Sequence, residues 1–231
     1  MKFDKTAVWG FEHAIRGMRN PMNSHDKSDS RLVLMNENDV EFGCEPNYEY
    51  IIGENDTNLA QRLIKGGSEH RKFLRQIFVS VDITAPLYWW KEFDTYKIST
   101  TANSTSTMHK IHSKEIEVSD FSIDDFDISI TDNTVELSFM DLFLNTVTDC
   151  ETLRKAYMET GDKRYWKALI QLLPASYNQK RTVTMTYENL RNMYFQRKYH
   201  KLNEWSESFI RWVESLPYAK ELIMYEGQEA E

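Results

Sequence analysis

The 231-residue sequence is poor in cysteine, proline and glycine, and it has no excess of positive charge. Its two cysteines, Cys44 and Cys150, are too few for a disulfide framework and lack the spacing of a zinc site, so we expect two reduced thiols. The net charge is −8 at pH 7, whereas a nucleic-acid-binding protein needs a basic face for its phosphate contacts. We therefore expect no nucleic-acid partner, although a local cationic pocket can still bind one nucleotide.

Long apolar runs and self-sufficient catalytic motifs are also missing. No run approaches the length of a membrane span, and charges interrupt residues 1–20, so we expect a cytoplasmic protein with no signal peptide and no membrane partner. There is no G-x-S-x-G, P-loop, H-E-x-x-H or G-x-G-x-x-G motif. His109 and His112 could share a helix face, but no third metal ligand lies near them, so we expect no metal site.

Apolar residues, in contrast, are plentiful. They make up 41% of the chain and aromatic residues 13%, which is enough to bury one core, so we predict a single domain over residues 1–231. Residue patterns predict helices over 5–18, 54–67, 86–93 and most of the chain after residue 134, and strands within 32–53 and 77–84. The acidic stretch 113–133 is predicted to be a surface excursion. These elements predict an α+β fold.

Two polar features are candidate binding elements. The hydroxyl-rich tract 99–107 could present donors to a phosphate or a ring carbonyl, although a polar loop is the simpler interpretation. Further along, Arg197 shares a predicted helix face with Leu190 and Met193. An arginine on a face that enters a core needs an anion, which is either an acidic side chain or a ligand phosphate.

Two segments resemble the flavin-dependent thymidylate synthase family. Residues 66–110, "GGSEHRKFLRQIFVSVDITAPLYWWKEFDTYKISTTANSTSTMHK", follow the family's order of glycine-rich turn, histidine, short helix, strand, Ala-Pro and aromatic helix. Residues 172–197, "LLPASYNQKRTVTMTYENLRNMYFQR", follow its Leu-Pro, β segment, helix start and distal arginine. The resemblance implies a mixed or antiparallel sheet core, a mostly helical C-terminal half and a homotetramer. Tryptophans 89, 90, 205 and 212 would then pack either at subunit interfaces or in the core.

The resemblance also implies a site. The family is a class of methyltransferases of dTMP biosynthesis that methylate dUMP, taking carbon from methylenetetrahydrofolate and hydride from reduced flavin. FAD is therefore an implied cofactor, joined by methylenetetrahydrofolate and NADPH if the protein is catalytic. The matching nucleotide-binding positions are Lys97, Asn103, Thr105, Ser106, Arg191 and Arg197. The matching flavin-contacting positions are His70 and Asn192.

The chain departs from the family at several charged positions. The Arg-His-Arg signature falls on Thr95, Tyr96 and Lys97, and an arginine of the later helix start falls on Glu188. Each lost charge-assisted hydrogen bond is worth about 1.5–3 kcal/mol. We therefore expect a divergent protein that acts on or binds a dUMP-like pyrimidine nucleotide, and the replaced signature argues against methylation. Two alternatives stay open: a non-catalytic nucleotide-binding or nucleotide-sequestering module, and a scaffold with a vestigial site.

Overall fold

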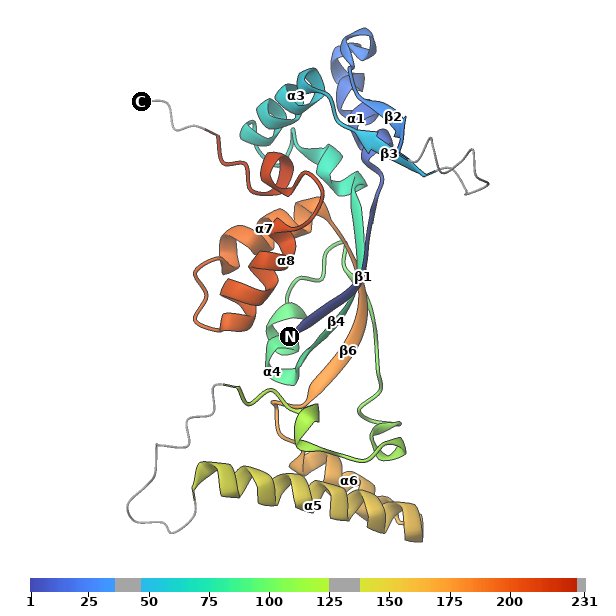
Figure 1. Cartoon of the computed structure of the whole chain (residues 1–231), viewed down its shortest axis with the longest axis vertical. Coiled ribbons are helices and arrows are strands. Elements are labelled where there is room, and N and C mark those ends of the chain that lie inside the picture. Colours follow the sequence, from blue (N-terminus) through green and yellow to red (C-terminus); the bar gives the residue numbers. More distant parts are fainter. Residues whose placement is uncertain (36–46, 125–137, 228–231) are drawn as a thin grey trace. The chain divides into compact units, whose positions relative to one another are not determined.

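The computed structural model describes residues 1–35, 47–124 and 138–227, which form an α+β architecture (Figure 1). The chain divides into two compact units, each assembled from separate stretches of sequence. The first contains Met1–Asp4, Asp82–Tyr96 and Ala102–Thr182. The second contains Lys5–Val81, Lys97–Thr101 and Val183–Glu231.

The described residues include six strands, which form two sheets. The four-stranded sheet has the order β1-β4-β6-β5, with β1 at Lys2–Trp9, β4 at Phe78–Pro86, β6 at Asn178–Thr186 and β5 at Thr101–Ser104. The second sheet is an antiparallel pair of β2, Arg31–Leu34, and β3, Tyr48–Ile51. The β segment that the resemblance implies after Leu173-Pro174 is β6.

The helices largely confirm the sequence patterns. The α-helices are α1 (Phe11–Arg19), α3 (Glu54–Lys65), α4 (Leu87–Phe93), α5 (Phe139–Thr160), α6 (Lys163–Leu172), α7 (Tyr187–Arg197) and α8 (Ile210–Glu214). Short 3-10 helices cover Asn20–Met22, His25–Lys27, Lys72–Gln76, Ile111–Ser113 and Val118–Asp120, and π-helices cover Glu204–Phe209 and Ala219–Ile223. As expected, α4 follows a proline and α5 ends at a glycine, Gly161, with φ of 68°.

The start of the chain corrects one prediction. We predicted a helix over 5–18, but residues 5–9 belong to β1, and α1 begins only at Phe11. Gly10 separates the two elements with φ of 96°, a left-handed conformation that glycine adopts at little cost. A Cβ at Gly10 would lie 2.2 Å from the carbonyl oxygen of Gln76, so this turn also requires the absence of a side chain.

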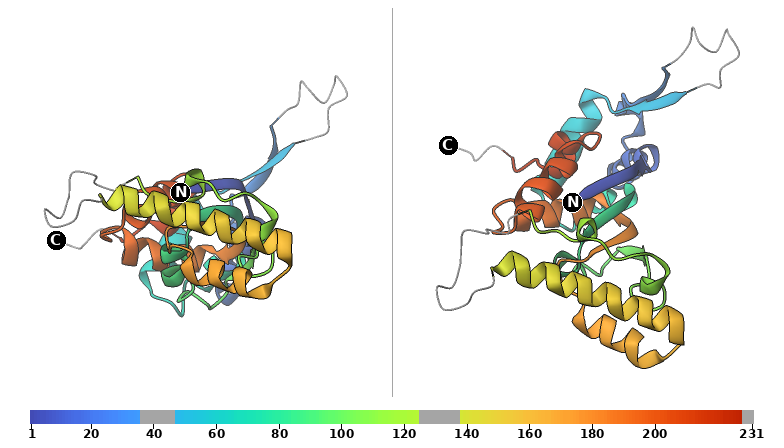
Figure 2. Two further views of the ribbon diagram at one scale, coloured as in Figure 1. Left: turned by 90° about the horizontal axis from the view of Figure 1, so that it is seen from below. Right: turned by 60° about the horizontal axis from the view of Figure 1, so that its bottom comes forward.

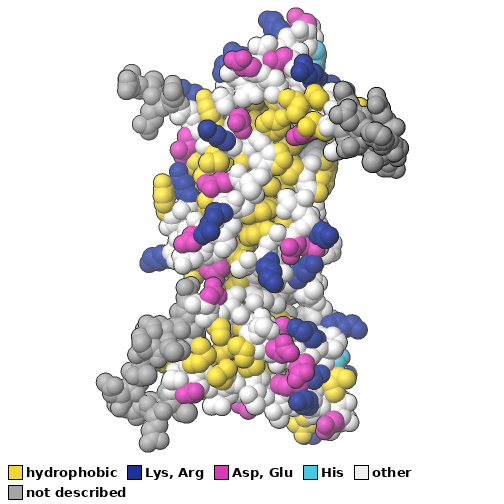
Figure 3. Space-filling view, viewed as in Figure 1, with side chains coloured by type: hydrophobic (Ala, Val, Ile, Leu, Met, Phe, Trp, Pro, Cys, Tyr) yellow, Lys and Arg dark blue, Asp and Glu magenta, His cyan; other side chains and the backbone are white. Residues whose placement is uncertain are grey.

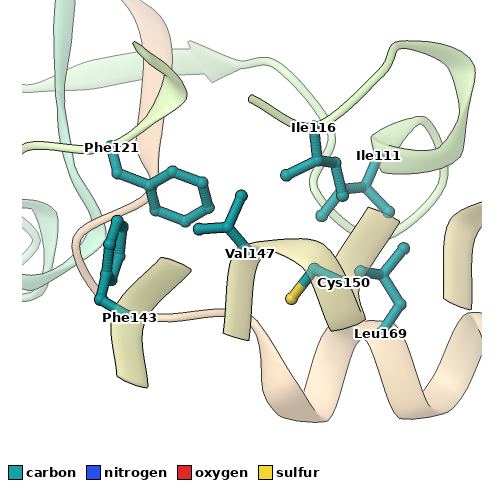
Figure 4. Close-up of a cluster of buried hydrophobic side chains, with 7 residues drawn as sticks. All are labelled: Ile111, Ile116, Phe121, Phe143, Val147, Cys150 and Leu169. Carbon is teal, nitrogen blue, oxygen red and sulfur yellow. The ribbon is translucent and has the colours of Figure 1, made fainter. Parts of the chain in front are cut away.

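The core of the first unit packs against the helices α5 and α6. These two helices run side by side in both views of Figure 2. Seven side chains form its central cluster (Figure 4): Ile111, Ile116, Phe121, Phe143, Val147, Cys150 and Leu169. Ile116 and Phe121 belong to the stretch 113–133, which we predicted to be a surface excursion. That prediction is wrong for these two positions, because their apolar side chains contribute to the core despite acidic neighbours. Residues 125–133 lie outside the described residues.

All four tryptophans that could have served a subunit interface are buried within the chain itself. Trp89 and Trp90 of α4 lie in the first unit, whereas Trp205 and Trp212 lie in the second. The Trp90 indole Nε1 donates to the backbone oxygen of Gln179 at 3.0 Å. Core packing therefore accounts for these residues.

Cys150 is a buried free thiol, and burial raises its pKa to about 11. The other cysteine, Cys44, lies outside the described residues. Within the described parts of the chain, no helix has both the length and the apolar character needed to cross a membrane.

Leu169 is fully buried, so Leu169→Ala is expected to lower the free energy of unfolding by about 2–5 kcal/mol, because the vacated volume is only partly refilled. Leu172→Ala on the same helix is the matched control, since its side chain is 39% exposed. Urea denaturation of both variants measures the difference. Equal losses would contradict the packing described for α6.

Glu151 provides a pH-dependent test. Arg154 donates to it twice at 2.7 Å, and this ion pair lowers the pKa of Glu151 from 4.5 to about 2, with a further hydrogen bond from the Ile116 backbone. The resulting stability is present above pH 4.5 and is lost as the pH falls through about 2. Glu151→Gln should therefore be less stable than the wild type at neutral pH, and the difference should shrink on acidification. Glu159→Gln, at an exposed position of α5, should leave the pH profile unchanged.

Candidate functional site

A surface cavity in the second unit contains His70, one of the predicted flavin contacts. Its volume is about 540 Å³, which lies within the range of about 300–1,000 Å³ that is usual for small-molecule sites. Its apolar wall comes from Met18, Met22, Leu63 and Phe73, and its polar wall from Asn20, Glu69, His70, Lys72 and Gln76. A cavity of this composition suits a flat ring with a few hydrogen-bonding groups.

The turn between α3 and the 3-10 helix Lys72–Gln76 positions His70. The backbone N–H of His70 donates to the Gly67 carbonyl at 3.0 Å, and Gly67 has φ of 95°. A Cβ on Gly66 would lie only 3.1 Å from the imidazole ring. The paired glycines therefore give the ring its place at the cavity wall, while the side chain stays exposed.

A buried charge cluster connects this turn with α7. Arg71 Nε donates to both carboxylate oxygens of Glu188, at 3.2 and 3.0 Å, and Glu188 is only 8% exposed. Arg191 is equally buried, donates to the Ile223 carbonyl at 2.6 Å and lies 4.7 Å from the Phe195 ring. Burial lowers the pKa of Arg191, and the nearby charge of Arg71 lowers it further. Glu188 stands at the position where the resemblance implies an arginine, and its carboxylate neutralises the guanidinium of Arg71.

Arg197 and Asn192 occupy other faces of α7. The Arg197 guanidinium lies 4.8 Å from the ring of Trp205, so an aromatic face is one of its partners. The expected anionic partner, an acidic side chain or a ligand phosphate, remains a prediction. Asn192 is exposed, and its side chain can reach a ligand from the surface of the helix.

The hydroxyl-rich tract is not the plain polar loop that we had considered, because Thr101–Ser104 forms β5 at the edge of the sheet. Thr105 uses its hydroxyl locally, since both its backbone N–H and its hydroxyl donate to the Lys180 carbonyl, at 2.9 and 3.2 Å. The Ser106 hydroxyl accepts from the His109 backbone at 2.8 Å. Asn103 is exposed on β5.

Lys97 lies in the short stretch Lys97–Thr101 and is exposed. Ser99 within this stretch has φ of 56°, a left-handed conformation that is uncommon for serine. The carbonyl of Ile98 accepts a hydrogen bond from the Asn189 side chain at 2.6 Å, which attaches the stretch to the start of α7.

The structure therefore sorts the predicted site residues into two sets. Asn103, Thr105 and Ser106 belong to the first unit. The second unit holds the remaining positions: His70, Lys97, Arg191, Asn192 and Arg197. In the described parts of the chain, no three histidine, cysteine, aspartate or glutamate side chains are grouped so that they could hold a metal ion.

The architecture defines a class of fold, that of the flavin-dependent thymidylate synthases. Two crystal structures of the enzyme from Helicobacter pylori, both with FAD and dUMP, are similar over almost the whole chain. One has a TM-score of 0.63 and 17% identity, and the match covers 98% of each chain. The other has a TM-score of 0.65 and 16% identity, and the match covers 98% of this chain and 100% of that one. No family model and no curated protein matches the sequence.

Sequence reasoning missed the residues that surround the predicted positions. Met18, Phe73 and Gln76 line the His70 cavity, and Arg71 joins Glu188, yet none carries a recognisable motif. Arg71 and Glu188 are 117 positions apart, so only the folded chain reveals their pairing.

The Arg71–Glu188 pair generates a charge-reversal test. Glu188→Arg places three guanidinium groups together and is expected to lower the free energy of unfolding by about 3–5 kcal/mol. The double variant Arg71→Glu, Glu188→Arg restores opposite charges and should recover part of that loss. Chemical denaturation of wild type, the two single variants Arg71→Glu and Glu188→Arg, and the double variant gives the coupling energy. A coupling energy near zero would contradict the contact.

Proposed function

We propose that this protein binds a pyrimidine nucleotide similar to dUMP. The observation that carries the proposal is the similarity, over almost the full length of both chains, to an enzyme whose crystal structures contain FAD and dUMP. The fold alone does not determine function, so the residues of the chain have to supply the binding groups. The nucleotide would be a small-molecule partner, held by a cytoplasmic protein that assembles as a tetramer.

Cationic and amide groups would share the work of binding. In this proposal Lys97 and Arg197 bind the nucleotide phosphate, because Lys97 is exposed and Arg197 is only half-buried. Arg191 would add positive charge near the phosphate from its buried position, since its guanidinium already donates to the Ile223 carbonyl. Asn103, Thr105 and Ser106 belong to the first unit, so the proposal does not depend on them.

A flavin fits the second unit only in part. The apolar wall of the His70 cavity suits the ring system, and His70 and Asn192 are exposed donors for its polar edge. The pyrophosphate of FAD would need free guanidinium groups, but Arg71 is paired with Glu188 and Arg191 with the Ile223 carbonyl. FAD is therefore proposed only as a second ligand, which His70 and Asn192 would contact at its ring system.

The charge arrangement also bears on turnover. Methylation of dUMP depends on cationic groups that polarise the pyrimidine and anchor phosphates. In this chain a carboxylate, Glu188, occupies one such position and is neutralised internally. A nucleotide-binding or nucleotide-sequestering module is therefore favoured over a thymidylate synthase-type methyltransferase, in which methylenetetrahydrofolate and NADPH would also take part.

Thermal unfolding with added dUMP tests the proposal, because a ligand that binds only the folded protein raises its melting temperature. Wild type should be stabilised, whereas Lys97→Ala and Arg197→Gln should each weaken binding by about tenfold or more, the loss of one charge-assisted hydrogen bond. Lys91→Ala, at an exposed position of α4, is the matched control and should respond as wild type does. No stabilisation by dUMP or by any other pyrimidine nucleotide would contradict the proposal.

Two further measurements separate binding from catalysis. Flavin absorbance of the purified protein reports whether FAD is retained, and His70→Ala should remove it if His70 contacts the flavin. Complementation of a thymidine-requiring bacterial strain reports methylation. We expect no growth without thymidine, and growth would show that the protein is a catalyst despite its altered charges.

A further inference from the structure

Two further surface cavities lie along α1 and suggest a second ligand site, and neither shares a lining residue with the His70 cavity. The first has a volume of about 350 Å³ and the second about 490 Å³. Their walls share Glu12, Leu32 and Tyr50, so the two cavities adjoin. All lining residues belong to the second unit, between β1, α1, the β2–β3 hairpin and Tyr218.

The first cavity is basic, in a protein whose net charge is −8. Three arginines and one histidine line it (Arg16, Arg19, His25 and Arg31), against a single carboxylate, Glu12. Arg19 is 3% exposed and is held by Asp56, so its own charge is balanced. Arg16 and Arg31 are exposed, and Arg16 Nη2 lies within hydrogen-bond distance of the His13 ring, at 3.3 Å, but neither arginine contacts a carboxylate in the described parts of the chain. Two guanidinium groups therefore face the cavity with capacity to bind an anion.

The second cavity is aromatic. Trp9, Phe11, Tyr48, Tyr50 and Tyr218 line it, and hydrophobic side chains gather on the surface beside the β2–β3 hairpin (Figure 3). Trp9 is 46% exposed and Tyr48 is 60% exposed, which is unusual for side chains of this size. The charged lining residues here include Glu12 and Glu49, so an anion is disfavoured in this cavity and a flat ring is favoured.

We propose that the adjoining cavities bind a small compound that carries one flat aromatic ring and one phosphate group. The phosphate lies in the basic cavity between Arg16 and Arg31, and the ring packs against Trp9 and Tyr48. Phosphate is the anion of choice because the planar forks of two arginines match its oxygens. This site is separate from the proposed dUMP site and does not depend on it.

Three probes test the two halves of the site: phenyl phosphate, inorganic phosphate and phenol. Isothermal titration calorimetry should show that phenyl phosphate binds at least tenfold more tightly than either of the other two. Arg16→Ala and Arg31→Ala should each weaken phenyl phosphate binding about tenfold or more, the loss of one charged contact. Tyr48→Ala should weaken phenyl phosphate binding and leave inorganic phosphate binding unchanged.

Arg62→Ala is the matched control, because Arg62 is an exposed arginine on α3 that lines neither cavity. Circular dichroism establishes that each variant is folded, as expected for exposed positions. Lys97→Ala should bind phenyl phosphate normally, and Arg16→Ala should still respond to dUMP, so failure of one site is distinguishable from failure of the other.

Equal binding of all three probes, or wild-type affinity in both arginine variants, would overturn the proposal. A change of oligomeric state in Tyr48→Ala, measured by light scattering, would also overturn it by identifying an interface between copies.

Discussion

Asp56 carries a charge that has no exposed surface, and the surrounding chain is arranged to hold it. Within the described residues its carboxylate accepts five hydrogen bonds, from Arg19 Nε, the Ser28 hydroxyl, the Asp29 backbone, and the backbone and hydroxyl of Ser30. Burial alone would raise the pKa of Asp56, but these hydrogen bonds lower it below its usual value. The loop before β2 is thereby fastened to the first turn of α3, and the basic cavity takes its shape from this attachment. A buried carboxylate needs hydrogen-bond donors around it. Arg19 of α1 and residues 28–30 supply those donors to Asp56.

The same requirement explains how the fold and its chemistry can diverge. Glu188 and Arg71 neutralise one another inside the second unit, and Glu188 lies one helical turn before Arg191 on α7. Glu188 places a carboxylate at this position, and its contact with Arg71 joins the turn after α3 to α7. A fold shared with thymidylate synthases at 16–17% identity is therefore compatible with a different arrangement of charged side chains.

Local patterns were sufficient to predict much of the fold. The spacing of apolar residues predicted α3, and α5 lies within the stretch after residue 134 that was predicted to be mostly helical. Local patterns failed where neighbours in space decide the outcome. Residues 5–9 satisfied a helical period but pair into the sheet as β1, and Phe121 is buried among acidic neighbours by the helices above it. The candidate positions could be named from resemblance, but the pairing of Arg71 with Glu188 depends on a contact between residues 117 positions apart.

The buried thiol of the first unit has a practical consequence. Cys150 has no exposed surface, and its raised pKa keeps almost all of it protonated near neutral pH, so alkylating reagents cannot attack it in the folded protein. The rate at which Cys150 becomes modified is then the rate at which the α5–α6 core opens. Peptide-resolved mass spectrometry can follow that opening without any engineered label, and it can do so even in a mixture with other proteins.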